Sequence, residues 1–146
     1  MYIISACLLG TNCKYSGGSN ETEWVKKFAE EHSICAVCPE TLAGLPTPRE
    51  PCERKDGKVV SETGIDLTEE FEAGAESAYQ VAMDEAEVRE EKIEGAILKA
   101  KSPSCGAGKI YDGTFSHTVI SGDGCFAKIL NDHGIRIITD EESIDD

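Results

Sequence analysis

Three short apolar runs of the chain each lead into a cysteine. The runs are Ile3-Ile4-Ser5-Ala6 before Cys7, Ile34-Cys35-Ala36-Val37 before Cys38, and Ile97-Leu98-Lys99-Ala100 ahead of Cys105. Apolar runs of this length, ended by turn residues, are typical of buried β-strands. If the strands are parallel neighbours, their carboxyl ends meet at one edge of the sheet, where open α/β folds bind ligands. We therefore expect Cys7, Cys38 and Cys105 to lie close together at that edge.

Helical segments separate the expected strands. The sequence predicts strands at residues 2–6, 33–37, 95–100 and 135–139, and helices at 21–31, at 66–91 and between Asp123 and Gly134. The second helix carries one apolar stripe with three- and four-residue spacing, formed by Leu67, Phe71, Ala75, Tyr79, Ala82 and Ala86. Strands that alternate with helices predict a parallel sheet covered on both faces. We expect a single α/β domain over residues 1–146, with a mostly parallel Rossmann-like sheet, a small hairpin insertion and a frayed acidic tail at 140–146.

Turn residues predict the connections. Asp56-Gly57 predicts the hairpin insertion, and Asp112-Gly113 predicts a second hairpin between residues 109–111 and 114–115. Residues 39–51 hold four of the five prolines and are expected to form a stiff irregular loop. Asn20, followed three residues later by Glu23, predicts a reciprocal cap for the first helix.

Composition narrows the class of partner. The chain has a net charge of −14, from 28 acidic residues against 14 Lys and Arg. This balance argues against a polynucleotide substrate, because nucleic-acid affinity comes largely from cationic contacts with phosphate. The sequence shows neither an apolar run of membrane-spanning length nor a signal peptide, so we expect a cytoplasmic protein without a membrane partner. In the cytoplasm, seven cysteines favour metal binding or thiol chemistry over a disulfide framework.

The individual cysteines are expected to play different roles. Cys7, Cys38 and Cys105 follow their strands in the same way, and three thiolates around one point suit an iron–sulfur cluster or zinc. Cys13 is the candidate for a fourth ligand; without it, one coordination position of the metal stays open, as in metal sites that perform chemistry. Spacing alone leaves open the alternative that these are scattered core cysteines. Buried structural thiols are expected at Cys35, Cys52 and Cys125.

Polar residues close to these cysteines are candidates for the chemistry. Glu40 lies two residues after Cys38 and can move protons, and Ser102 lies three residues before Cys105 and can orient or attack a substrate atom. Taken singly, Glu40 could be a surface carboxylate and Ser102 a turn residue before proline. Arg49 and Lys101 could contact an anion or a base carbonyl, or balance nearby acids. The three histidines, including His117, are expected in surface or capping positions.

Six motifs, spread in order from Tyr2 to Thr139, resemble one protein family. They are Ser5-Ala6-Cys7-Leu8-Leu9-Gly10, Cys13-Lys14-Tyr15, Cys38-Pro39-Glu40, Gly44-Leu45-Pro46-Thr47-Pro48-Arg49, Ser102-Pro103-Ser104-Cys105-Gly106 and Ile110-Tyr111-Asp112-Gly113. The family is bacterial and archaeal, was long catalogued as a domain of unknown function, and includes the [4Fe–4S]-dependent thiouracil desulfidases.

The resemblance implies a [4Fe–4S] cluster held by Cys7, Cys38 and Cys105, with Glu40 as acid/base and Ser102 as the catalytic hydroxyl. It implies non-redox desulfuration, in which the iron without a protein ligand is a Lewis acid for the thiocarbonyl sulfur of a compound such as 2-thiouracil, giving uracil and hydrogen sulfide. The expected substrate is a thiolated base or nucleoside, and the iron–sulfur assembly machinery is the expected partner for cluster delivery. Residues expected to contact the substrate are Cys13, Arg49, Lys101 and Ser104.

Two other functions use some of the same cysteines. A non-catalytic module for sulfur or iron trafficking would need the three cysteines but neither Glu40 nor Ser102. A zinc-stabilised fold would use Cys35, Cys38 and other ligands.

Overall fold

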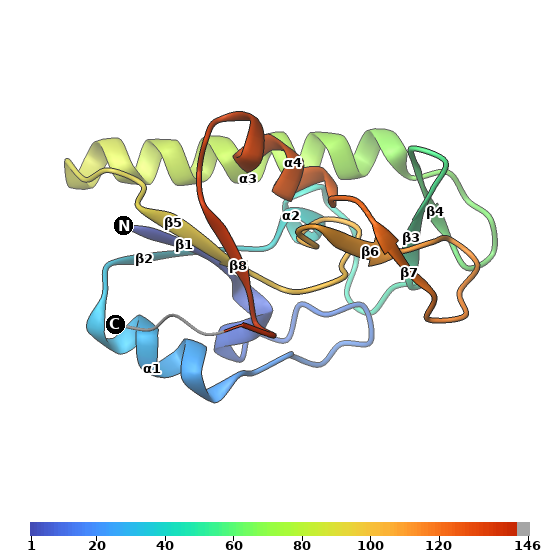
Figure 1. Ribbon diagram of the computed structural model, residues 1–146, viewed down its shortest axis with the longest axis horizontal. Coiled ribbons are helices and arrows are strands. Elements are labelled where there is room, and N and C mark those ends of the chain that lie inside the picture. Colours follow the sequence, from blue (N-terminus) through green and yellow to red (C-terminus); the bar gives the residue numbers. More distant parts are fainter. Residues whose placement is uncertain (143–146) are drawn as a thin grey trace.

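A four-stranded parallel sheet forms the centre of the molecule (Figure 1). The computed structural model describes residues 1–142. The strand order is β2 (Ile34–Val37), β1 (Tyr2–Ser5), β5 (Gly95–Leu98) and β8 (Ile137–Thr139). Every neighbouring pair is parallel, with Tyr2 opposite both Ile34 and Gly95. The predicted α/β fold with a parallel sheet is therefore confirmed.

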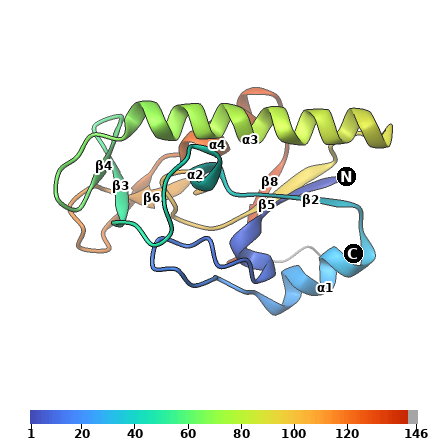
Figure 2. The same cartoon turned by 180° about the vertical axis from the view of Figure 1, so that it is seen from behind.

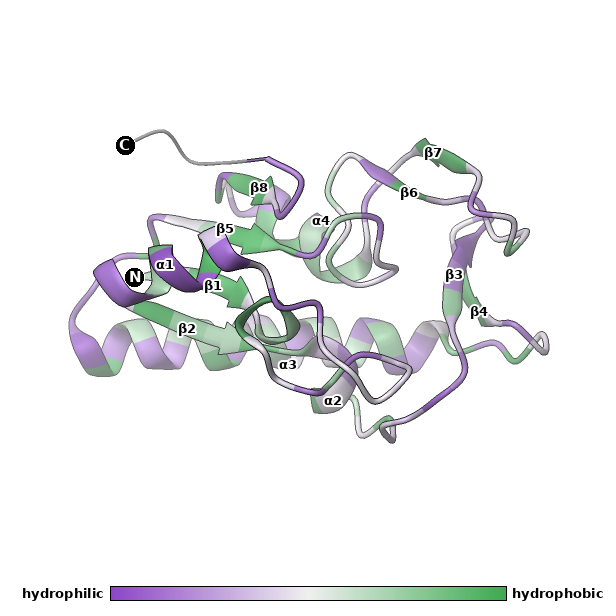
Figure 3. Ribbon diagram, turned by 90° about the horizontal axis from the view of Figure 1, so that it is seen from below, coloured by the Kyte–Doolittle hydropathy of each residue, from purple (hydrophilic) through white to green (hydrophobic). Residues whose placement is uncertain are grey.

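Helices cover both faces of this sheet (Figures 1 and 2). Alternation along β1 sends Ile3 into a core shared with α3 (Thr68–Arg89) and α4 (Cys125–Asp132). It sends Ile4 into a second core, against α1 (Glu23–Glu31). Figure 3 shows the hydrophobic strands between these layers, and hydrophilic residues alternating with apolar ones along α3. No helix within residues 1–142 combines the length and apolarity needed to cross a lipid bilayer.

Helix α3 has the predicted apolar stripe, and the stripe is wider than predicted. Phe71, Ala75, Ala82 and Ala86 are buried, and Gly74 and Ala78 are buried with them. Gly74 lies under the short helix α2 (Pro39–Leu42), where a Cβ would come within 2.1 Å of the Pro39 carbonyl oxygen. Because glycine has no side chain, the two helices can pack backbone to backbone. This contact fixes the position of α2 at the end of β2.

Both predicted hairpins exist, but one has a different return strand. The hairpin of β3 (Cys52–Lys55) and β4 (Lys58–Ser61) turns at Asp56-Gly57, as predicted. Strand β6 (Lys109–Tyr111) pairs with β7 (Val119–Ser121), so the return strand predicted at 114–115 is wrong. The Asp112 carboxylate accepts hydrogen bonds from the backbone N–H and hydroxyl of Thr114, which favours a longer loop at that point.

Three further local predictions are wrong for identifiable reasons. The irregular loop predicted at 39–51 is confirmed for residues 43–51 but wrong for 39–42, where Pro39 begins α2, because the first position of a helix tolerates a missing N–H. The predicted cap at Asn20 does not form, since Thr22 precedes α1 and the Asn20 amide donates to the Cys7 sulfur instead. The tail is anchored at its start: the Asp140 carboxylate accepts the Ala100 N–H at 2.7 Å. Residues 143–146 lie outside the described part of the chain.

Candidate functional site

A cavity of about 540 Å³ lies beyond the carboxyl ends of β1, β2 and β5. Its lining includes three cysteines that come from distant parts of the chain, namely Cys7, Cys38 and Cys105. Glu40, Arg49, Lys101, Ser102 and Cys13 also line it. Of the candidate site residues, Ser104 alone is absent from this lining. The structure thus brings the three strand-end cysteines to one cavity.

Each of these three thiols is held by a different local structure. Cys7 lies on the 3₁₀ helix η1 (Ala6–Leu9), and the Asn20 amide donates to its sulfur at 3.4 Å. Cys38 precedes α2, and the Thr41 hydroxyl donates to its sulfur at 3.1 Å. Cys105 is 5% exposed, at the end of the loop that follows β5. The Cys7 and Cys38 sulfurs therefore each accept a hydrogen bond from a polar side chain, the outer-shell support typical of cysteine ligands to metal clusters.

Cys13 is buried beside two of these thiols. Its own pKa is raised, first because its proton is directed to the Cys38 and Cys7 sulfurs. The same interaction lowers the pKa of Cys38 to about 5 and also lowers the pKa of Cys7. Burial, by contrast, raises the pKa of Cys105. Cys13 thus supplies a proton that favours thiolates at Cys7 and Cys38.

Glu40 occupies the first turn of α2 with both carboxylate oxygens engaged. Oε1 accepts the Nε–H of Arg49 at 3.1 Å, and Oε2 accepts the hydroxyl of Ser104 at 3.3 Å. The side chain is 17% exposed, toward the cavity that it lines. Burial raises the pKa of Glu40, and the Arg49 guanidinium opposes part of that rise. A carboxylate that is oriented and raised in pKa is suited to accept a proton at neutral pH.

The loop after β5 holds Ser102 and Cys105 in a fixed turn. The Ser102 Oγ accepts the backbone N–H groups of Ser104 and Cys105, each at 3.1 Å. Gly106 allows this turn to close, since a Cβ there would lie 2.7 Å from the Ser102 carbonyl oxygen. Ser102 is therefore both a turn residue and a cavity residue, with its hydroxyl proton still available to donate.

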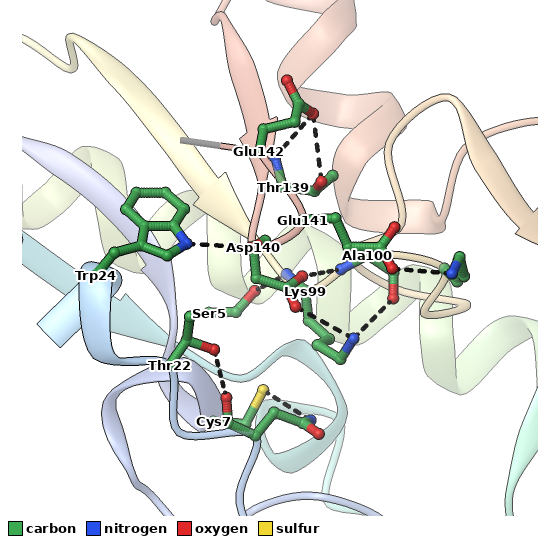
Figure 4. A network of polar contacts seen from close by, with 12 residues as sticks. Ser5, Cys7, Thr22, Trp24, Lys99, Ala100, Thr139, Asp140, Glu141 and Glu142 are labelled. Atoms are coloured by element: carbon green, nitrogen blue, oxygen red, sulfur yellow. Dashed lines mark hydrogen bonds and ion pairs between the residues drawn. The ribbon is translucent and has the colours of Figure 1, made fainter. Parts of the chain in front are cut away.

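Residues 140 and 141, which follow β8, hold the start of the loop after β5 through hydrogen bonds and ion pairs (Figure 4). Asp140 accepts the Ala100 N–H and pairs with Lys99 at 3.5 Å, while its carbonyl accepts the Trp24 indole N–H at 3.1 Å. Lys101 pairs with Glu141 at 2.9 Å. Both lysines line the cavity, so acids from the chain end partly neutralise the cations at the site.

The remaining cysteines differ in their surroundings. Cys35 is buried in the core beneath α3, as predicted, and burial raises the pKa of its thiol. Cys125 is also buried, and its sulfur accepts a hydrogen bond from Arg54 at 2.8 Å. The prediction of a buried thiol is wrong for Cys52, which is half-buried and lines the cavity.

Sequence reasoning missed several residues of the cavity. Asn20 was expected to cap a helix, yet it lines the cavity. His117 is exposed, as predicted, and it also lines the cavity. Tyr111, Phe115 and Glu53 line it as well. The motif Tyr111-Asp112-Gly113 was the one sequence signal for these residues. It predicted no role for them, because the sequence does not show that the loop that carries it packs against β3.

The donor set of the cavity suits an iron–sulfur cluster. Cysteine thiolates are soft ligands that select such clusters, and the Cys7 and Cys38 sulfurs each have a hydrogen-bond donor. Throughout residues 1–142, no three His, Cys, Asp or Glu side chains are grouped closely enough to hold a single metal ion. That grouping concerns the ligands of one ion, whereas a cluster of several irons would be held here by Cys7, Cys38 and Cys105. The zinc alternative gains no support, since Cys35 lies in the core beneath α3 and away from this cavity.

Comparison with known proteins agrees with the fold. The geometry defines an α/β protein with a cysteine-lined cavity at the carboxyl ends of its parallel strands. Residues 2–142 match the model of the 2-thiouracil desulfurase family. A solved structure, the [4Fe–4S]-dependent thiouracil desulfidase TudS, superposes with a TM-score of 0.84 and is 40% identical, covering 96% of this chain and 90% of that one. The uncharacterized protein YbbK of Bacillus subtilis (strain 168) is 38% identical over 152 residues, which is 97% of each chain. The chain belongs to the 2-thiouracil desulfurase family.

Proposed function

We propose that this protein removes sulfur from a small thiolated compound such as 2-thiouracil, in a cluster-dependent reaction that changes no oxidation state. Water replaces the sulfur: the thiocarbonyl becomes a carbonyl, and the products are uracil and hydrogen sulfide. The observation that carries the proposal is the convergence of Cys7, Cys38 and Cys105 on one cavity that Glu40 also lines. The likeness to TudS supports it.

The cofactor in this proposal is a [4Fe–4S] cluster held by Cys7, Cys38 and Cys105. When bound, such a cluster supplies a thiophilic Lewis acid that polarises the carbon–sulfur bond. Three protein ligands would leave one iron of the cluster without a ligand from the protein. Cys13 is then free to act beside the cluster, where we propose that it contacts the substrate.

Glu40 is proposed as the general base. Its carboxylate takes a proton from the water that adds to the thiocarbonyl carbon, and it returns a proton as the carbon–sulfur bond breaks and hydrosulfide leaves. The hydrogen bonds from Arg49 and Ser104 hold the carboxylate in one orientation. Positioned acid–base groups of this kind typically contribute about 10²–10⁴-fold to a rate.

Ser102 is proposed as the hydroxyl that orients the substrate. Its oxygen already accepts two backbone N–H groups, so its proton is directed elsewhere and can be donated to an oxygen or nitrogen of the ring. Lys101 is a proposed second contact from the same loop. For Ser104 and Arg49 we propose a different role from the expected substrate contact: Ser104 is 1% exposed, and both bind Glu40, so they act as positioning residues.

We further propose that the protein works in the cytoplasm on a free base or nucleoside, and that iron–sulfur assembly proteins deliver its cluster. The net charge of −14 supports a small substrate over a polynucleotide.

The test is anaerobic reconstitution with iron and sulfide, followed by incubation with 2-thiouracil, 4-thiouracil and their nucleosides. The proposal predicts equal amounts of uracil (or uridine) and sulfide from at least one of them, with many turnovers per chain. Full cluster occupancy without sulfide release from any thiobase would contradict it, and would favour the trafficking module.

A further inference from the structure

An aromatic group from the β6–β7 hairpin borders the same cavity as the cysteines. Tyr111, Phe115 and His117 all line it, and the Tyr111 and His117 rings meet edge to face with centroids 5.4 Å apart. None of them contacts the three thiols through a hydrogen bond, and none is needed to hold a cluster. They therefore contribute to the lining without a role in holding the cluster.

The loop that carries this aromatic group has an unusual backbone. Phe115 and His117 both have positive φ, 58° and 60°, a conformation that costs non-glycine residues free energy. A chain of side-chain bonds stiffens the loop, from Asp112 to Thr114, then to Ser116 and Thr118. Strained conformations persist where the surroundings hold them, and they gather at binding sites.

Glu53 on the neighbouring strand β3 holds the loop in place. Its Oε1 accepts the backbone N–H of Gly113 at 3.1 Å and that of Phe115 at 3.0 Å, and its side chain is buried. Gly113 packs so close to β3 that a Cβ would lie 2.6 Å from the Cβ of Lys55. Figures 1 and 3 show β3 beside this hairpin. The β3–β4 insertion thus serves as the support for the β6–β7 loop.

From this geometry we infer that Tyr111 and Phe115 bind the planar face of the substrate ring, and that Glu53 is a positioning residue that acts through the loop. The inference rests on the proposed function and adds a substrate preference to it: the site selects flat thio-heterocycles over open-chain thioamides. Aromatic side chains stack on any flat heterocycle, and truncation to alanine weakens base binding by roughly five- to more than 100-fold.

The binding test uses anaerobic calorimetry of the reconstituted protein with uracil, which has the ring but no sulfur. Phe115→Ala and Tyr111→Ala should each weaken uracil binding about tenfold or more. Val119→Ala removes an exposed apolar side chain on the same hairpin, outside the cavity lining, and should bind like the wild type. Glu53→Ala should weaken binding, whereas Glu53→Gln should retain it, since the amide oxygen can still accept both N–H groups.

A second readout compares substrates. The two aromatic substitutions should raise KM for 2-thiouracil and leave kcat/KM for thioacetamide, an open-chain thioamide, nearly unchanged. Wild-type affinity for uracil in Phe115→Ala and Tyr111→Ala, or absence of uracil binding in the wild type, would overturn the inference. A wild type that binds uracil but releases no sulfide would contradict the proposed function and leave this inference standing.

Discussion

The Nε–H of Arg49 donates to the Oε1 of Glu40 across 3.1 Å, at the wall of the cysteine-lined cavity. Both side chains are largely buried, with exposed fractions of 8% and 17%. The same guanidinium donates to the Cys13 carbonyl at 2.8 Å and to the Thr47 hydroxyl at 2.9 Å. One arginine therefore ties α2 to the loop that carries Cys13 and orients the proposed base.

Arg49→Lys should lower kcat about tenfold while leaving the iron content unchanged. Lysine keeps the charge but cannot donate to Glu40, Cys13 and Thr47 from one planar group. Hydrogen bonds to charged groups are each worth about 1.5–3 kcal/mol, which sets the scale of the loss. The measurement is sulfide release per reconstituted chain. Arg136→Lys, at an exposed position, is the matched control, and equal kcat in the two variants would count against a positioning role.

Glu40→Gln should lower sulfide release about 100-fold or more, because glutamine keeps the size of the side chain but cannot take a proton. Iron content should stay at the wild-type level, since Glu40 is not a cluster ligand in this account. Glu62→Gln changes the net charge equally at another cavity residue and should keep wild-type turnover. Undiminished activity in Glu40→Gln would remove Glu40 from the mechanism.

Gly74→Ala gives a test in which two physical effects have opposite signs. Helix propensity alone would stabilise the protein by about 1 kcal/mol. Packing predicts the reverse, because the new methyl would lie 2.1 Å from the Pro39 carbonyl oxygen and 2.8 Å from the Ala43 Cβ. We expect destabilisation of about 1–3 kcal/mol and reduced activity as α2 shifts. Thermal unfolding followed by circular dichroism measures it, with the exposed Ala73→Gly as control; a Tm above that of the wild type would contradict the packing argument.

Cys52 should behave as a protonated thiol at neutral pH although it lines the cavity. Burial, together with the nearby Glu40, raises the pKa of Cys52 to about 11. Since the thiolate is the reactive form, the rate of its alkylation should rise about tenfold per pH unit between pH 7 and 9. Peptide mass spectrometry after timed iodoacetamide labelling reads this rate. An alkylation rate that does not change between pH 7 and 9 would show that Cys52 is already a thiolate, and Cys52 would then be a candidate fourth ligand of the cluster.

The sequence predicted the sheet well, because each strand is a continuous apolar run whose register is set by two buried faces. The meeting of Cys7, Cys38 and Cys105 followed from this: parallel strands that end together deliver their next residues to one edge. Helices α3 and α4 were predicted from the three- and four-residue spacing of their apolar residues, to within a few residues at their ends.

Long-range contacts limited the rest of the prediction. The role of Ser104 depends on a hydrogen bond to Glu40, 64 residues away, and Glu53 supports a loop about 60 residues further on. No local pattern encodes such pairs. The short helix α2 was missed because prolines ordinarily argue against helices, whereas the first helical position tolerates one.

The most direct test of the account is the iron and acid-labile sulfide content of single-cysteine variants after anaerobic reconstitution. The wild type, Cys13→Ala, Cys35→Ala and Cys125→Ala should each carry about four iron atoms per chain, as one [4Fe–4S] cluster requires. Cys7→Ala, Cys38→Ala and Cys105→Ala should each hold much less iron and release no sulfide from 2-thiouracil. Full iron content and wild-type sulfide release in any of these last three variants would contradict the proposed cluster site.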